Sequence, residues 1–425
     1  MAHSLSKDER LQCDRRSEAL LSETLAALAG FDSSRLDPTE WRLLARRGQV
    51  AVHRALSANH GAAGTHRRRA VGSGFLDGTL NDIVGGLYVE NDADLLTTQA
   101  LLSPSGNTVA DAAVLLIEER RQPRAAPFRF AGVKWYSWKK KLSAGQNANG
   151  AGQKANAAAN LSVDSQECDL LTYERMGMAL TEDRGTGGMQ ELVYHVQLSL
   201  HKPEWPLDVA RGPGLRRAEM AMCFLYRKVS DDLVECFTLV DYDSRVSATS
   251  RRTADSEVAD RVLMVTRLPD CARAKVFSTF ANKVKGRPVM MSKMCLRCGS
   301  KRKVLDLLRT CCICKKSVCQ KCFELKPVFS VNSRTHEPET DAFCNKCITR
   351  IEIMRAAKNT TANKTSGSTD GGSSTSGSSK DRDKENNSGG STGSSSKKTF
   401  KFWRKSKDKL QANQEQQNAT SKILE

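Results

Sequence analysis

The sequence predicts an α+β fold, followed by a small metal-binding module and a tail without stable structure. Strand-like segments come first in the central part of the chain and helical segments come last, an order typical of α+β domains. Eight cysteines then form four C-x-x-C pairs between residues 295 and 347. After residue 357 the composition changes to serine, glycine, threonine, asparagine and lysine, which cannot bury enough apolar surface to fold.

The composition is that of a globular protein. The 425 residues, of which 39% are hydrophobic, are enough for two or three domains with at least one buried core. No apolar run approaches the roughly 18–20 residues that span a bilayer, and the N-terminus lacks the apolar segment of a secretion signal. We therefore expect a cytoplasmic protein, in which thiols stay reduced and clustered cysteines indicate metal rather than disulfides.

The chain is strongly basic, with a formal net charge of +18. Such a charge attracts polyanions, which include both anionic membranes and nucleic acids. Charge alone does not distinguish the two.

A helix is expected over residues 4–30, within an N-terminal segment 1–40. Ser6 and Glu9 have the spacing of a capping box, leucines recur through the segment, and Gly30 ends it. We expect this helix to pack on the domain that follows.

The central domain is predicted from alternating and helical patterns between residues 41 and 284. Rough two-residue alternation indicates an antiparallel sheet with one buried face, at 191–200, 219–229 and 233–242. The last two segments are joined by a short polar turn, which indicates a hairpin. Helices are expected at roughly 254–268 and 270–284.

An insertion inside this domain and the C-terminal tail have no apolar periodicity. Residues 143–166 are rich in alanine, asparagine and glycine, so we expect a mobile loop. Residues 358–425 are predicted to be disordered. Within the tail, Phe402 and Trp403 lie among lysines and arginines. This composition suits a membrane interface, and it also suits single-stranded nucleic acid or a nuclear import signal.

The cysteine pairs predict two structural Zn²⁺ ions. Two residues between paired sulfurs let a tight turn direct both thiolates at one ion, and four thiolates complete a closed tetrahedral shell. The eight predicted ligands are Cys295, Cys298, Cys311, Cys314, Cys319, Cys322, Cys344 and Cys347. Cys312 is left over as a spare thiol. Sequential and alternate pairing both satisfy the spacing.

The spacing of these pairs resembles that of FYVE-type zinc fingers over about residues 295–355. CLRC is followed by twelve residues, CCICKKSVCQKC, 21 residues and CNKC. The resemblance implies a cross-braced module at 290–357, in which Cys295, Cys298, Cys319 and Cys322 share one ion and the other four ligands share the second. It also implies a role at phosphoinositide-containing endosomal membranes.

Cations near the finger are the expected membrane contacts. Lys301, Arg302 and Lys303 lie on the loop after Cys298, ahead of two apolar residues. FYVE domains carry a basic, histidine-containing stretch around the third ligand, and of this only Arg309 remains here. Cations next to an anionic bilayer each contribute roughly 1 kcal/mol.

A second resemblance covers roughly residues 40–284. It rests on the segments VGSGFLDGTLNDIVGGLY (71–88), APFRFAGVKWYSW (126–138) and CDLLTYERMGMA (168–179) together with the terminal helix pair, which look like START-like lipid-binding domains. The resemblance implies a helix-grip fold, in which a curved antiparallel sheet wraps a long C-terminal helix around a cavity for an apolar lipid. From alternation and helical periodicity, the cavity candidates include Phe224, Tyr226, Phe237, Val276 and Phe280.

The motifs favour a binding or adaptor protein over an enzyme. The chain has no GxSxG, Walker A or HExxH motif, and a closed zinc shell leaves no position for substrate. The expected partners are anionic membrane lipid, an apolar lipid and other proteins, with nucleic acid less favoured. The alternatives are a RING-like ubiquitin ligase and a zinc-containing nucleic-acid-binding protein.

Overall fold

The computed structural model describes residues 3–33, 36–56, 67–103, 107–122, 126–140, 166–182, 187–206, 215–243, 251–301 and 308–365. Residues 143–165 of the predicted insertion and residues 366–425 of the predicted tail lie outside this set. No described helix is both long and apolar enough to cross a membrane.

The N-terminal helix forms as predicted. Helix α1 spans Lys7–Gly30, and the Ser6 side chain and Glu9 side chain cap each other's backbone amides in a capping box. Leu20 and Leu21 pack in an apolar cluster with strand residues of the central sheet. This face of the sheet, covered by α1, is called the outer face below.

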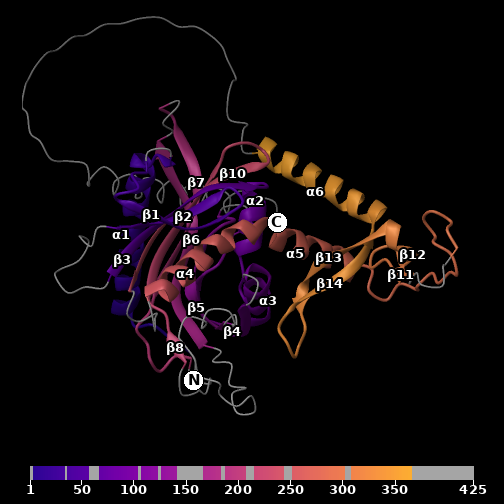
Figure 1. Cartoon of the computed structure of the whole chain (residues 1–425), viewed down its shortest axis with the longest axis horizontal. Coiled ribbons are helices and arrows are strands. Elements are labelled where there is room, and N and C mark those ends of the chain that lie inside the picture. Colours follow the sequence, from indigo (N-terminus) through magenta and orange to yellow (C-terminus); the bar gives the residue numbers. More distant parts are fainter. Residues whose placement is uncertain are drawn as a thin grey trace, which may run out of the picture. The chain divides into compact units, whose positions relative to one another are not determined.

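Ten strands form one sheet (Figure 1). Along the sheet the order is β1-β2-β3-β10-β9-β7-β6-β5-β4, with antiparallel pairing throughout, and β8 pairs with β6 in parallel. The strands are β1 Trp41–Arg47, β2 Val50–Ala55, β3 Arg67–Asp77, β4 Asn107–Glu119, β5 Phe130–Lys140, β6 Gln166–Glu182, β7 Met189–Ser199, β8 Arg216–Arg217, β9 Met220–Lys228 and β10 Leu233–Asp243. The predicted hairpin is the β9–β10 pair.

Helices cover the opposite, inner face of the sheet. They are α2 Leu80–Leu87, α3 Asp92–Leu102, α4 Arg251–Leu263, the 3₁₀ helix η2 Met264–Arg267 and α5 Leu268–Asn282. In Figure 1, α4 lies across the strands and α5 continues from it toward the finger. A single antiparallel sheet around a C-terminal helical segment is the helix-grip architecture that the sequence resemblance implied.

The break between the last two helices is earlier than predicted. The chain passes through η2 at Met264–Arg267, and Pro269 lies in the first turn of α5 rather than between two helices. Proline is tolerated there because the first amides of a helix have no intrahelical partner.

The central strands are buried on both faces, whereas the alternation predicted one buried face. On β9, Phe224 and Tyr226 belong to the inner core, and Cys223 and Leu225 belong to the outer core. Helix α1 is the reason, because it covers the face that the pattern left to solvent.

The finger follows α5. It contains β11 Arg309–Thr310, β12 Ser317–Val318, the 3₁₀ turn η3 Gln320–Cys322, the hairpin β13 Phe323–Val331 and β14 Pro338–Cys344, and helix α6 Asn345–Thr365. The helix therefore continues past residue 357, where the disordered tail was predicted to begin. All of these elements belong to one compact unit with the sheet, Met1–Gly367.

Substitutions at two adjacent glycines of α2, Gly85 and Gly86, can test how closely α2 packs against α5. A Cβ on Gly86 would lie 2.4 Å from the Leu268 carbonyl oxygen, whereas one on Gly85 would lie 3.7 Å from the Ala272 Cβ, an ordinary contact. Gly86→Ala should therefore lower the free energy of unfolding by about 1–3 kcal/mol, as overpacking does. Gly85→Ala is the matched control and should be neutral or stabilising by up to about 1 kcal/mol, because alanine favours helix. Urea denaturation measures both; equal effects would contradict the close contact.

Candidate functional site

The finger brings the eight predicted thiols into two groups of four. Each group takes its members from two C-x-x-C pairs that alternate along the sequence, and the sulfurs of a group all lie within 4.8 Å of one another. The first group is Cys295, Cys298, Cys319 and Cys322, and the second is Cys311, Cys314, Cys344 and Cys347. Of the two pairings that the spacing allowed, the structure shows the interleaved one.

The sulfur distances fit a tetrahedral metal shell. Metal–sulfur bonds of about 2.3 Å in a tetrahedron place neighbouring sulfurs about 3.8 Å apart. The Sγ atoms of Cys298 and Cys319 are 3.7 Å apart, and those of Cys314 and Cys344 are 3.8 Å apart. Four protein ligands per ion leave no open coordination position, so both groups suit a structural metal.

Tight turns hold the first pair of each thiol group in place, Cys295/Cys298 and Cys311/Cys314. The amide of Gly299 donates to the carbonyl of Cys295, and the amide of Lys315 donates to that of Cys311, both at 2.9 Å. Gly299 and Lys315 adopt positive φ values of 72° and 56°, which fold the chain back after the second cysteine of each pair.

Arg297 contacts thiols of both groups. Its backbone amide donates to the Sγ of Cys295 in the first group at 3.4 Å. Its guanidinium donates to the Sγ of Cys344 in the second group, at 3.4 Å from Nε and 3.3 Å from Nη2. This hydrogen bond is the main reason that the pKa of Arg297 is raised above its ordinary value. A fixed cation beside clustered thiolates offsets part of their mutual repulsion.

Cys312 belongs to neither group. Its side chain is half-buried in an apolar cluster that joins the finger to α5, and burial raises the pKa of its thiol to about 11. The prediction that it is a spare thiol agrees with this placement.

The apolar cluster between finger and α5 corrects two cavity predictions. Val276 and Phe280 pack with Val328, Phe343 and other finger residues, so they do not line the inner cavity. Val276 and Phe280 do form an apolar stripe on α5, but this stripe packs against the finger. The periodicity of a helix identifies an apolar face and does not identify what covers it.

Polar contacts reinforce this interface. The Ser278 hydroxyl accepts a hydrogen bond from the amide of Phe329 at 2.6 Å. Lys275 donates from Nζ to the carbonyls of Gly85 and Tyr88 and lies 4.9 Å from the centre of the Phe329 ring. One lysine of α5 therefore contacts both the segment at the end of α2 and the finger.

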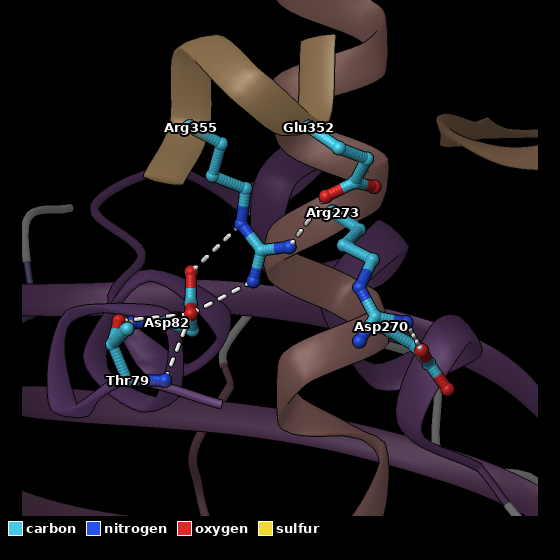
Figure 2. A network of polar contacts seen from close by, with 6 residues as sticks. All are labelled: Thr79, Asp82, Asp270, Arg273, Glu352 and Arg355. Atoms are coloured by element: carbon cyan, nitrogen blue, oxygen red, sulfur yellow. Dashed lines mark hydrogen bonds and ion pairs between the residues drawn. The ribbon is translucent and has the colours of Figure 1, made fainter. Parts of the chain in front are cut away.

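Helix α6 adds an ion pair to α2 (Figure 2). The Arg355 guanidinium lies 2.7 Å from one carboxylate oxygen of Asp82 and 3.1 Å from the other. Asp82 also accepts hydrogen bonds from Thr79 at the cap of α2. Both charged side chains are largely buried, with exposed fractions of 14% and 9%, so solvent screens this pair less than a surface pair.

A cavity lies between the inner face of the sheet and the helices. The volume of this cavity that the centre of a water molecule can occupy is about 50 Å³. The helices contribute mainly apolar side chains, and the sheet contributes mainly polar ones. Its lining residues are Leu87, Val89, Leu95, Thr98, Gln99, Leu102, Lys134, Tyr136, Glu174, His195, Gln197, Phe224, Tyr226, Arg261, Met264, Val265 and Leu268.

Phe224 and Tyr226 line the cavity as predicted, and Phe237 does not. In the β9–β10 register Phe237 is opposite Leu225, and directly opposed residues share a face of the sheet. Phe237 therefore packs in the outer core, where it meets Phe31 after α1. The error arose because both faces of these strands are apolar, so alternation did not indicate which face is inner.

A buried charged network crosses the cavity wall. Lys134 Nζ lies 2.8 Å from Glu174 Oε2, and each side chain is 3% exposed. Gln197 donates to Glu174 Oε1 at 2.8 Å, and His195 Nε2 lies 3.2 Å from Oε2. Burial opposes the ionisation of Glu174, but Lys134 and His195 hold its pKa well below the ordinary value. The carboxylate is therefore ionised.

On the sheet side of this wall, two polar atoms have no hydrogen-bond partner among the described residues. They are Nδ1 of His195 and the hydroxyl of Tyr226, in side chains that are 5% and 0% exposed. Because an unpartnered buried polar group costs about 1–3 kcal/mol, each of these atoms indicates a place for a ligand atom or an ordered water.

The sequence-based prediction of site residues did not include Lys134, Glu174, His195 or Gln197. The available signal was their position: each occupies a strand site of the same parity as inner-core residues, such as Tyr136 on β5 and Val193 on β7. Charged residues at inward positions of a strand are uncommon and mark a functional hypothesis.

The predicted membrane-contact residues are only partly described. Lys301 is exposed and pairs through its backbone with Met294. Arg309 is exposed on β11, with its guanidinium 5.9 Å from the centre of the Phe323 ring. Arg302, Lys303, Phe402 and Trp403 lie outside the described residues.

No protein-family model matches the chain, and no curated protein matches it by sequence. Among solved structures, human STARD10 is 12% identical, with a TM-score of 0.34 over 61% of this chain and 79% of that one. The lipid transfer and protein localization domain of human StarD13 (DLC2) is 11% identical, with a TM-score of 0.32 over 60% of this chain and 94% of that one. Human StAR-related lipid transfer protein 5 is 11% identical, with a TM-score of 0.33 over 62% and 98%. Likenesses this distant carry no inference about function, and the helix-grip assignment depends on the strand order and helices above.

Arg297 should stabilise metal in the second thiol group. Residues that contact metal ligands typically change metal affinity about 10–100-fold when removed, so Arg297→Leu should speed metal transfer to a chromophoric chelator by at least about tenfold. Arg297→Lys keeps the charge without the planar fork and should be intermediate. Arg287→Leu, at an exposed arginine outside the ligand set, is the control. Unchanged transfer from the Leu variant would show that Arg297 is not part of the metal site.

The Arg355–Asp82 pair should couple α6 to the helix-grip domain. A double-mutant cycle of Arg355→Leu and Asp82→Asn, followed by urea denaturation, should give an interaction energy of about 1–3 kcal/mol. Arg350→Leu removes an exposed arginine of the same helix and should change little. An interaction energy near zero would mean that the contact does not hold α6 in solution.

Proposed function

We propose that this chain is a zinc-dependent, lipid-associated binding protein without catalytic activity. Its helix-grip domain binds an apolar ligand, and its finger and tail bring it to anionic membranes in the cytoplasm, including endosomal ones. The cavity carries the proposal, since it joins an apolar helical wall to a buried polar wall with two unpartnered atoms. The START-like and FYVE-type sequence resemblances support the same assignment.

The polar wall favours a ligand with a hydroxyl head group. Because Glu174 is ionised, it accepts a hydrogen bond from Nε2 of His195. In the tautomer whose one hydrogen is on Nε2, Nδ1 is an acceptor that faces the cavity without a partner among the described residues. The Tyr226 hydroxyl can donate or accept. A ligand hydroxyl can donate to the first and accept from the second, whereas a purely apolar molecule would leave both without partners.

The ligand must displace the helices to enter. At 10–15 Å³ for each water centre, the cavity holds roughly three to five waters. Pockets that bind small molecules have volumes of about 300–1,000 Å³, so this cavity is too small for a lipid. The apolar wall is built from α2, α3, η2 and the start of α5. These helices are therefore the elements that move when a larger ligand binds.

Zinc is the metal that the donor set favours. Four thiolates in a closed tetrahedral group are characteristic of structural Zn²⁺, and iron is the principal competitor for such a site. The four thiolates of each group would hold one ion. Binding of each ion would contribute on the order of 10 kcal/mol to the free energy of folding.

Tyr226→Phe tests the proposed cavity function with opposite effects on stability and binding. Because the hydroxyl is buried without a partner, its removal should raise the free energy of unfolding of the delipidated protein by about 1 kcal/mol. It should also reduce retention of a hydroxyl-bearing lipid, measured by native mass spectrometry after incubation with a mixed lipid extract.

Tyr136→Phe is the matched control, because the Tyr136 hydroxyl accepts a 2.8 Å hydrogen bond from Arg261. That substitution should lower stability instead. Wild-type protein that retains no apolar molecule from the extract would refute the proposed function.

A further inference from the structure

Four apolar side chains are exposed at the base of the finger. They are Val289, Met290, Met291 and Met294, with exposed fractions from 41% to 86%, and we call them the methionine patch. They immediately precede the first metal ligand, Cys295. The membrane-contact loop predicted from the sequence follows Cys298 instead, and most of that loop lies outside the described residues.

The backbone of this segment is held against the rest of the finger. Met290 donates from its amide to the carbonyl of Lys315 at 2.8 Å and accepts from the amide of Ser317 at 3.3 Å. Met294 forms a bridge with Lys301. Since these contacts fix the backbone beside both thiol groups, the side chains are presented outward from an ordered support.

Exposed cations flank the methionine patch in the sequence, and this stretch of the chain contains no acidic residue. Lys285, Arg287, Lys293 and Lys301 are all exposed. Between Asp270 and Asp306 the sequence contains no aspartate or glutamate. A segment that combines exposed apolar side chains with exposed cations is complementary to a bilayer with anionic head groups.

The composition of the segment favours a bilayer over nucleic acid. Between Lys285 and Lys301 there is no aromatic residue on which a base could stack. Methionine is flexible and apolar, and it adapts to irregular apolar surroundings. Exposed apolar patches of this kind mark interaction sites on soluble proteins.

We propose that the methionine patch is the surface through which the finger docks on anionic membranes, with Met290 and Met291 entering the interface and the flanking cations contacting lipid head groups. The inference rests on the proposed membrane association and names its site. It assigns docking to the segment before the first metal ligand, and it requires no headgroup-specific pocket.

The test uses the full chain carrying Phe402→Ser and Trp403→Ser, so that the tail does not mask the finger. Co-sedimentation compares vesicles of phosphatidylcholine with vesicles that also contain phosphatidylserine. Met290→Ser with Met291→Ser should reduce partition to the anionic vesicles at least about tenfold, given the apolar area removed. Lys293→Glu should reduce it too, and added salt should weaken the binding that remains.

Met189→Ser is the matched control, because Met189 is 64% exposed on the helix-grip domain. It should leave partition unchanged. Metal content verifies that each variant is folded. Equal partition of the Met290→Ser, Met291→Ser protein and its parent would overturn the proposal, as would failure of the parent to bind anionic vesicles, or a preference of the patch for single-stranded DNA over vesicles.

Retention of lipid in the cavity, measured on the same variants, separates this inference from the proposed function. If the patch variant loses vesicle binding but retains cavity lipid, the result bears on the methionine patch alone. If the parent retains no cavity lipid, the result contradicts the proposed function instead.

Discussion

The interleaved use of four thiol pairs is the constraint on which the finger depends. Each group joins a pair near the start of the finger to a pair further along, so neither group can assemble from a continuous segment. The hairpin of β13 and β14 lies between the third and fourth pairs in the sequence, and the fourth pair spans the end of β14 and the first turn of α6. Metal binding therefore fixes both ends of this hairpin. A module this small has too little apolar area to fold without such ties.

Helix α5 transmits this constraint to the rest of the protein. Its first residue, Leu268, lines the cavity, while Val276, Phe277 and Phe280 pack with the finger. One helix is therefore part of two apolar clusters. The Arg355–Asp82 pair and Lys275 add polar contacts between the same elements. The finger is in this way a structural continuation of the helix-grip domain rather than a separate module on a linker.

The sequence was most informative where chemistry restricts spacing. The capping box at Ser6 and Glu9 located α1, the polar turn located the β9–β10 hairpin, and the C-x-x-C pairs identified all eight grouped thiols. Predictions from the sequence were wrong where an apolar pattern could pack against either of two surfaces. Phe237 and Phe280 are apolar at the expected period, but their partners are α1 and the finger, which no local pattern specifies. The buried network of Lys134 and Glu174 was missed because each residue, taken alone, is typical of an exposed strand position.

Metal held by the two interleaved thiol groups should order the finger and, through the finger, the side of α5 that it covers. Hydrogen exchange by mass spectrometry, on the full chain before and after metal removal by a chelator, measures both effects. After metal removal, we expect the amides of the finger to lose protection throughout residues 308–351 and those of α5 to exchange faster, while the central strands stay protected. Unchanged protection in the finger after complete removal of metal would contradict it.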